Sequence, residues 1–429
     1  MTDTDARSGG SASSQRRSGG VLRHRDFRLL WLGETTSEVG TSISGVAVPL
    51  VAVVTLQASA LQVSALTAAA WLPWLAIGLP AGAWVDRLPR RPLMQVCNIT
   101  RLLLLLSIPA AAWSGTLTIG HLLVVALLTG VASVFFQTAY QVYLPGVVGD
   151  DHLPAANAAL QGSESVAQVA GPSLAGLVAQ LAGAVTGLVA DALSFLVSTV
   201  CLRLIHAQDT PTTRAGRPIP LRSQMADGLR FVRADPYLRV LAVFGAASNL
   251  ALTGYQAILV IFLIRDVGIS PGGVGLLISG MSVGGVIGAA GAGVVARRFG
   301  TAHGMLICEF VAAPFALLIP LTSPGVGLLC VVGGGIGVGA GIVGGDVIKS
   351  SFRQTYTPRH LLGRVVVTMQ FLNYGTIPLG ALLAGVLAAN LGLRPTLWIM
   401  VSCLVLASLV LLTGPIRRHR DLPIHSAPH

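Results

Sequence analysis

The chain has 429 residues, of which 53% are hydrophobic and only 10% are charged. This composition excludes an ordinary water-soluble domain, because such domains carry about 25% charged residues. The formal net charge of +11 would suit a nucleic-acid-binding protein, so the placement of the basic residues has to decide what that charge means.

Long apolar stretches recur along the whole chain after a first tail. Residues 1–28 are rich in Ser, Gly and Arg and contain no apolar core, which predicts a cytosolic tail and not a signal peptide. A bilayer core of about 30 Å takes roughly 20 apolar residues per helical crossing, so the later stretches predict membrane-spanning helices. In chain order, the twelve predicted spans are Leu29–Leu56, Ser64–Val85, Leu93–Trp113, Ile119–Leu144, Pro154–Leu181, Val185–Ile205, Tyr237–Ile264, Gly273–Ala296, Met305–Leu321, Gly325–Ile348, Val365–Leu391 and Thr396–Thr413.

The twelve spans fall into two sets of six. The first set occupies residues 29–205 and the second residues 237–413, with a polar cytoplasmic linker at 206–236 and a second tail at 414–429. Two short segments repeat between the sets: GAWVDRLP at 82–89 returns as GVVARRFG at 293–300, and GPSLAG at 171–176 returns as IPLGALLAG at 377–385. Such duplication predicts two parallel halves with a cavity between them.

The arginines sort by side of the membrane. With this layout, every arginine except Arg265 and Arg394 falls on the side of the two tails and the linker. Cytoplasmic loops carry an excess of Lys and Arg, so this side is predicted to be the cytoplasm and both termini are predicted to lie there. The basic charge therefore indicates membrane topology, and no nucleic-acid partner is expected.

Several segments resemble one transporter superfamily. They are Asp26–Trp31, Gly78–Arg87, Val166–Pro172, Asp191–Phe195, Leu362–Arg364 and Leu393–Trp398, which together extend over nearly the whole chain. They resemble the major facilitator superfamily and, within it, the drug–proton antiporter branch that contains macrolide, tetracycline and enterobactin-type exporters. The resemblance implies an all-α integral membrane fold of twelve transmembrane helices in two six-helix halves. It also implies alternating access to a central cavity lined by spans one, four, seven and ten.

The loop after the second span resembles the family's cytoplasmic gating motif. The motif positions are Gly82, Asp86, Arg87 and Arg90. The resemblance implies that Asp86 meets the start of span eleven near Arg364, where a helix N-terminus and an arginine both favour a carboxylate. Alternatively, the arginines of this loop only follow the excess of positive charge in cytoplasmic loops.

Span five carries a second motif of the branch. Gly171, Pro172 and Gly176 resemble the motif associated with antiporters rather than with uptake symporters. Small residues together with a proline predict a kinked helix that packs tightly next to the cavity. Small residues are also common in transmembrane helices for packing alone.

Ionisable residues at membrane depth are costly, so each one is a candidate for function. Glu34 and Glu38 are four residues apart in span one and share a helical face, which makes them a candidate site for protons as the coupling ion. Alternatively, Glu34 is a solvated group near the cytoplasmic end. Asp191 lies near the middle of span six and fits either proton coupling or a structural hydrogen bond to a Ser or Thr of a neighbouring helix.

Other polar residues in the spans are candidates for ion pairs or substrate contacts. Asp346 and Lys349 are three residues apart, which predicts a neutralising pair on one helix. Glu164 and Glu309 fit either a cavity or an interface between helices. The predicted substrate contacts are Gln137, Tyr140, Asn249, Tyr255, Gln256 and Asp346.

Several classes of function are disfavoured. The phosphate-binding pattern GxxxxGK[ST] is missing, which excludes ATP-driven transport by this chain. No constellation of nucleophile, base and acid appears, so no enzyme is predicted. Five single cysteines without metal-ligand spacing predict neither a metal site nor a cofactor.

The sequence therefore predicts a monomeric secondary active transporter in the cytoplasmic membrane of a bacterium. Its predicted activity is export of a small amphipathic molecule, a drug or secondary metabolite, by proton antiport with alternating access. The alternatives are an uptake permease for a small molecule and a non-transporting membrane sensor or enzyme on the same scaffold.

Overall fold

The structure, a computed structural model, describes residues 24–85, 87–149, 152–206 and 221–423. Within these ranges the secondary structure is helical and contains no strand. Twelve helices are long and apolar enough to cross a membrane, which confirms the predicted all-α membrane fold. The helices are α1 (Arg25–Leu50, continued by the π-helical turn η2, Val51–Thr55), α2 (Ala60–Val85), α3 (Arg90–Trp113), α4 (Ile119–Val148), α5 (Leu153–Ala182), α6 (Ala184–Leu204), the shorter α7 (Leu221–Ala234), α8 (Pro236–Arg265), α9 (Pro271–Phe299), α10 (Thr301–Ala316), α11 (Leu328–Tyr356), α12 (Arg359–Leu391) and α13 (Leu393–Leu409).

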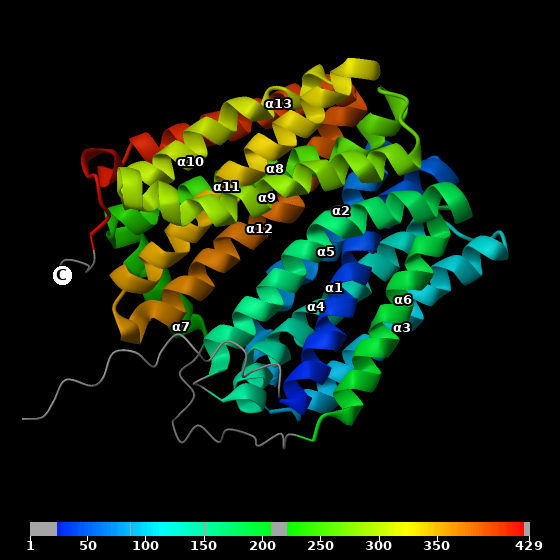
Figure 1. Cartoon of the computed structure of the whole chain (residues 1–429), viewed down its shortest axis with the longest axis horizontal. Coiled ribbons are helices and arrows are strands. Elements are labelled where there is room, and N and C mark those ends of the chain that lie inside the picture. The colour runs from blue at the N-terminus through cyan, green and yellow to red at the C-terminus, as the bar shows by residue number, and fades with distance from the viewer. Residues whose placement is uncertain (1–23, 86, 150–151, 207–220, 424–429) are drawn as a thin grey trace, which may run out of the picture.

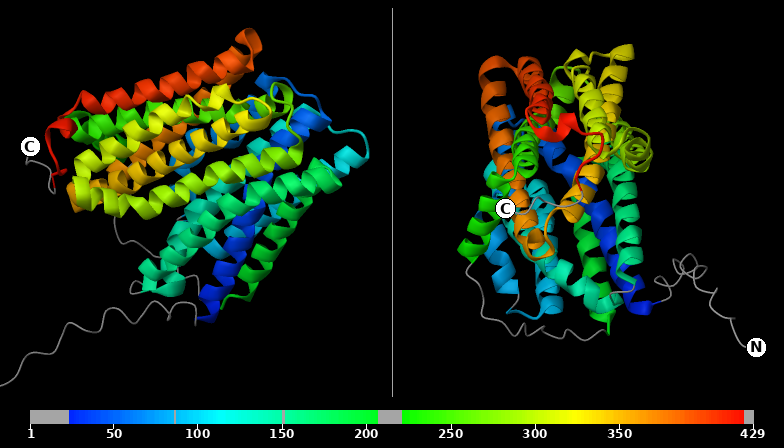
Figure 2. Two further views of the ribbon diagram at one scale, coloured as in Figure 1. Left: turned by 45° about the horizontal axis from the view of Figure 1, so that its top comes forward. Right: turned by 90° about the vertical axis from the view of Figure 1, so that its left-hand side faces the viewer.

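The membrane-spanning helices form two bundles that lie side by side. Helices α1–α6 make up the first bundle and α8–α13 the second, and the bundles are splayed at the end where α7 lies (Figures 1 and 2). We call the end where α1 begins and α7 lies the linker side, and the opposite end the far side. Leu103, Leu181 and Leu276 on the outer surfaces are 62%, 77% and 67% exposed, as expected of side chains that face lipid.

Helix ends follow from the local sequence. Asp235 caps α8 by accepting hydrogen bonds from the N–H groups of Tyr237 and Leu238, both at 2.9 Å. The Tyr356 hydroxyl, at the end of α11, donates to the same carboxylate at 2.6 Å. Gly183 alone separates α5 from α6, with a φ of 87° that a residue with a side chain adopts only under strain. These local features set where the helices begin and end.

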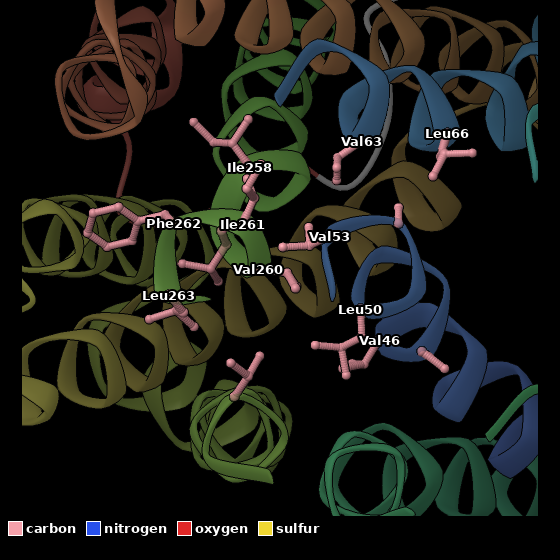
Figure 3. Packing of buried hydrophobic residues seen from close by; sticks show 14 of the residues in the cluster. Val46, Leu50, Val53, Val63, Leu66, Ile258, Val260, Ile261, Phe262 and Leu263 are labelled. Carbon is pink, nitrogen blue, oxygen red and sulfur yellow. The ribbon is translucent and has the colours of Figure 1, made fainter. Parts of the chain in front are cut away.

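On the far side, the two bundles share one apolar core. Leu50 of α1 belongs to the same cluster of fully buried apolar residues as Ile258 and Ile261 of α8 (Figure 3). The guanidinium of Arg265, at the end of α8, donates a hydrogen bond of 2.8 Å to the carbonyl of Ala58, which precedes α2. The far side is therefore closed by apolar packing and by a hydrogen bond from one bundle to the other.

On the linker side, each bundle has its own apolar core. The cluster in the first bundle includes Phe27 and Phe136, and the cluster in the second includes Leu238 and Phe352. Within the described ranges, no cluster of buried apolar residues on this side joins the two bundles. Space between the bundles is consequently left on the linker side.

Two pairs of helices make the most extensive contacts between the bundles: α5 with α9 and α2 with α12. At the first crossing, a Cβ added to Gly176 would lie 2.8 Å from the Cα of Gly275, and one added to Gly275 would meet the Pro172 carbonyl. Only glycine permits this approach of two helices. Gly171 and Pro172 are buried as well, so the motif of span five packs α5 tightly against its neighbours.

Candidate functional site

A cavity of about 560 Å³ lies between the two bundles on the linker side. It is lined by Trp71, Trp74, Gly78 and Gly82 of α2, Gln137, Thr138 and Gln141 of α4, Glu164 of α5, and Gly363, Arg364, Val367, Thr368, Gln370, Phe371 and Tyr374 of α12. Of the four spans expected around the cavity, only α4 lines it. The rest of its wall comes from α2 and α5 of the first bundle and α12 of the second. Helices α8 and α11 line a smaller cavity of about 130 Å³ inside the second bundle.

Three aromatic rings gather on one wall of the larger cavity. Trp71 and Trp74 are one helical turn apart on α2, and Tyr374 of α12 lies against both. The ring centroids are 6.4 Å apart for the tryptophan pair, and Tyr374 is 5.6 Å from Trp71 and 5.7 Å from Trp74. Sequence reasoning missed this group. The spacing of the two tryptophans was the only local feature that indicated an aromatic group, and nothing in the local sequence indicated that Tyr374 of α12 would join it.

Glu164 supplies the acidic group of the cavity wall. Its two carboxylate oxygens accept hydrogen bonds from the side-chain amides of Gln161 at 2.9 Å and Gln168 at 3.1 Å. All three residues lie on α5, three and four residues apart, where a helix brings side chains together. The sequence left open whether Glu164 lines a cavity or lies at an interface between helices, and in the structure it lines the cavity.

A cluster of charged residues is buried in the first bundle behind the cavity. Arg101 of α3 lies within electrostatic reach of Glu34 and Glu38 of α1 and of Asp191 of α6, and Glu38 lies within reach of Asp191. Glu34 is only 6% exposed and its Oε1 has no hydrogen-bond partner among the described residues, so the alternative of a solvated group is wrong. Asp191 accepts hydrogen bonds from the hydroxyls of Ser44 and Ser194, which is the structural hydrogen bond that the sequence left open.

Arg101 corrects the assignment of all but two arginines to one side of the membrane. It lies within α3, is 6% exposed, and its guanidinium carbon is 5.1 Å from the ring centroids of both Phe136 and Phe195. Its Nε has no hydrogen-bond partner among the described residues. Charged residues at membrane depth are candidates for function, and Arg101 meets this criterion. It was overlooked because all arginines but two were assigned to one side of the membrane.

A second charged cluster is buried in the second bundle. Lys349 of α11 forms ion pairs with Asp346 at 2.9 Å, as predicted, and with Glu309 of α10 at 2.7 Å. Its ammonium group also lies 4.7 Å from the centroid of the Phe244 ring of α8. Glu309 therefore lies at an interface between α10 and α11 and also lines the smaller cavity, and two carboxylates contact one ammonium group.

The residues of the gating motif are only partly described. Asp86 lies outside the described residues. Gly82 and Arg364 line the larger cavity, Arg87 is exposed and Arg90 is buried at the start of α3.

The predicted substrate contacts are dispersed. Gln137 lines the larger cavity, whereas Asn249 and Asp346 line the smaller one. Tyr140 stacks on Phe136 at 6.2 Å and lines neither cavity. The remaining two, Tyr255 and Gln256, lie on α8 outside both cavities. Tyr255 is 2% exposed in the far-side apolar core, whereas Gln256 is exposed.

Comparison with known sequences gives one family and several relatives. The family model described as transmembrane secretion effector matches residues 19–428. The multidrug efflux pump Tap of Mycolicibacterium fortuitum is 27% identical over 415 residues, which cover 93% of this chain and 98% of that protein. The enterobactin exporter EntS of Salmonella typhi is 25% identical over 408 residues, which cover 93% of this chain and 95% of that protein.

Comparison with solved structures concerns the fold. The nucleoside transporter NupG has a TM-score of 0.75 at 11% identity, covering 92% of this chain and 99% of that one. A bacterial homologue of ferroportin has a TM-score of 0.71 in its inward-facing state, at 16% identity, covering 91% of this chain and 98% of that one. Each of these two likenesses extends over more than nine-tenths of the chain.

Proposed function

Because the chain belongs to the transmembrane secretion effector family of the major facilitator superfamily, and is thus a multi-pass membrane transporter, we propose that it exports a small amphipathic molecule in exchange for protons. The similarity to a multidrug efflux pump and to an enterobactin exporter supports export. The observation that carries the proposal is the 560 Å³ cavity between the bundles, which lies beside a buried cluster of acidic residues.

The linker side is proposed to be the cytoplasmic side of a bacterial inner membrane. Arginines such as Arg91, Arg203 and Arg298 lie at helix ends on that side, which is the distribution expected of a cytoplasmic face. The structure then represents a state open to the cytoplasm and closed to the exterior. A cysteine replacing Gly115, in the turn after α3, is expected to react with a membrane-impermeant thiol reagent on intact cells. Absence of labelling there would contradict this orientation.

Transport requires the opposite state as well. We propose that the bundles rock about the α5–α9 and α2–α12 crossings, which separates the far-side core and closes the linker side. We still propose that Asp86 and Arg364 close the linker side. A carboxylate is attracted both to an arginine and to the N-terminus of a helix, and Arg364 lies near the N-terminus of α12.

Proton coupling is assigned to the acidic cluster of the first bundle. A proton taken up there neutralises a charge that is costly to bury, and its release restores the charge. We propose Glu38 as the carrier because it is only partly buried and lies in electrostatic reach of Glu164 in the cavity wall. Glu34 and Asp191 share the cluster, and Asp191 is held by two hydroxyls. Arg101 offsets part of their negative charge.

The experiment compares drug accumulation in cells that express the wild-type chain or Glu38→Gln. Compounds are first chosen by growth inhibition with and without expression. The wild type is expected to lower accumulation, and a protonophore is expected to abolish the effect. Glu38→Gln should abolish most gradient-driven export, because an amide cannot take up and release the proton at this depth. The control Asp266→Asn removes an exposed acid on the far side and should export normally.

Two results would contradict this assignment. Export by Glu38→Gln that equals the wild type and still responds to the protonophore would place the coupling site elsewhere. Higher accumulation in cells that express the wild type would indicate uptake.

A further inference from the structure

The larger cavity combines aromatic rings with one uncompensated carboxylate. We propose that it binds amphipathic organic cations, with Trp71, Trp74 and Tyr374 contacting the aromatic or planar apolar body and Glu164 binding the positive charge. The inference rests on the export function proposed above and names the chemical class of its substrate.

The aromatic rings are arranged so that they can contact an amphipathic cation. The planes of Trp71 and Trp74 are inclined to the ring of Tyr374 by 57° and 73°, so the three rings do not stack face to face on one another. The face of an aromatic ring carries negative potential and attracts cations. Trp71 and Trp74 come from the first bundle and Tyr374 from the second, so the contact of α2 with α12 brings the three rings together.

The charge of Glu164 has no cationic partner among the described residues. Both donors to its oxygens are neutral amides, and the ion pairs formed within the described chain do not include it. Gln161 and Gln168 hold the carboxylate in place without neutralising it. A fixed negative charge in the wall of a concave site attracts a ligand of opposite charge.

Arg364 lines the same cavity, so its position decides whether an anion would bind as well. It precedes Tyr374 by ten residues on α12, which corresponds to about 15 Å along the helix axis. Glu164, by contrast, lies within electrostatic reach of both Tyr374 and Glu38. Arg353 and Asp346 of α11 also act on Tyr374, and their charges are opposite. Among the described residues that line the cavity, Glu164 is therefore the charged group that acts on the aromatic ring.

The proximity of Glu38 and Glu164 connects the binding site to the coupling site. Two carboxylates in mutual reach repel each other, and either a proton or a cationic ligand relieves that repulsion. A cation bound at Glu164 and a proton on Glu38 therefore compete, which is the exchange that antiport requires. The volume of about 560 Å³ falls in the range of about 300–1,000 Å³ of small-molecule pockets.

The test measures equilibrium binding of two radiolabelled probes to the purified full chain in detergent, without any gradient. Tetraphenylphosphonium and tetraphenylborate carry the same four phenyl groups and opposite charges. The wild type is expected to bind the phosphonium saturably and the borate at least about tenfold more weakly, a ratio that corresponds to about 1.4 kcal/mol. This comparison needs no variant and does not depend on the folding of one.

Variants then locate the charge and the rings. Glu164→Gln keeps the shape of the side chain and should weaken phosphonium binding by about tenfold, and Trp71→Leu by about threefold to tenfold. Matched controls are Asp266→Asn, which removes an exposed far-side acid, and Trp113→Leu, which removes a tryptophan that is 75% exposed outside the cavity. Both controls should bind as the wild type does, and gel filtration checks that all four variants are folded.

Three results would overturn the inference: the wild type binds the borate as well as the phosphonium, it binds neither probe, or Glu164→Gln binds the phosphonium as the wild type does. If cells export other compounds while the purified chain does not bind the phosphonium, the proposed cation site is wrong and the proposed export function is retained. If the phosphonium binds through Glu164 while no compound is exported, the export function fails and the site stands.

Discussion

Each bundle buries a cluster of charges, and the two clusters are built in opposite ways. In the second bundle, Lys349 contacts Glu309 at 2.7 Å and Asp346 at 2.9 Å. In the first bundle, Arg101 lies between two phenyl rings, its Nε has no hydrogen-bond partner, and no ion pair within 4.0 Å joins it to Glu34 among the described residues.

The difference agrees with the proposed coupling role of the first cluster and with a structural role of the second. A buried ion pair with direct contacts resists changes of charge, because removing either partner leaves the other buried and unpaired. Charged groups that are near each other but form no ion pair can gain or lose a proton without an ion pair being broken. The cluster of the first bundle is therefore suited to coupling, and that of the second to holding α10 and α11 together. Three substitutions test this contrast by their effect on stability.

The largest loss of stability is expected for Lys349→Met. Glu309 is only 4% exposed and would keep its buried carboxylate without a cation, which costs about 3–5 kcal/mol. Thermal unfolding of the purified chain in detergent measures the loss. The double variant Glu309→Gln with Lys349→Met removes both charges and should recover most of it. Equal melting temperatures for the single variant and the wild type would remove the structural role from this cluster.

A smaller loss is expected for Asp191→Asn. Ser44 and Ser194 donate to different oxygens of the carboxylate, so the amide keeps an acceptor for only one of the two hydroxyls and loses the charge as well, at about 1–2 kcal/mol. Its melting temperature should fall less than that of Lys349→Met, and its export should stay above that of Glu38→Gln. Loss of gradient-driven export at normal stability would instead make Asp191 the proton carrier.

The smallest change in stability is expected for Arg101→Met. Burying a guanidinium with an unpaired Nε is itself unfavourable, which offsets the lost contacts with the rings of Phe136 and Phe195. The melting temperature should fall by less than half of the change in Lys349→Met. Gradient-driven export should nevertheless fall strongly, because the acidic cluster loses the cation that offsets its charge. Unimpaired export by this variant would show that Arg101 is not required for proton coupling.

The sequence by itself determined the helices and their order. Each apolar stretch has to become a helix in a bilayer, because no water is present there to satisfy its backbone. Stretches such as Ile119–Leu144 were therefore recognisable without any knowledge of their neighbours. Spacing along one helix was equally informative: Asp346 and Lys349, three residues apart, form the predicted pair.

Only the tertiary structure decided which residues meet across helices. Position along a helix gives the depth of a side chain, but packing of the bundles sets the direction in which it points. That is why Tyr374 joins Trp71 and Trp74 in the cavity, Glu309 reaches Lys349 from another helix, and Tyr255 is buried in the far-side core instead of lining the cavity. These contacts join segments far apart in the chain, which no local pattern of the sequence brings together.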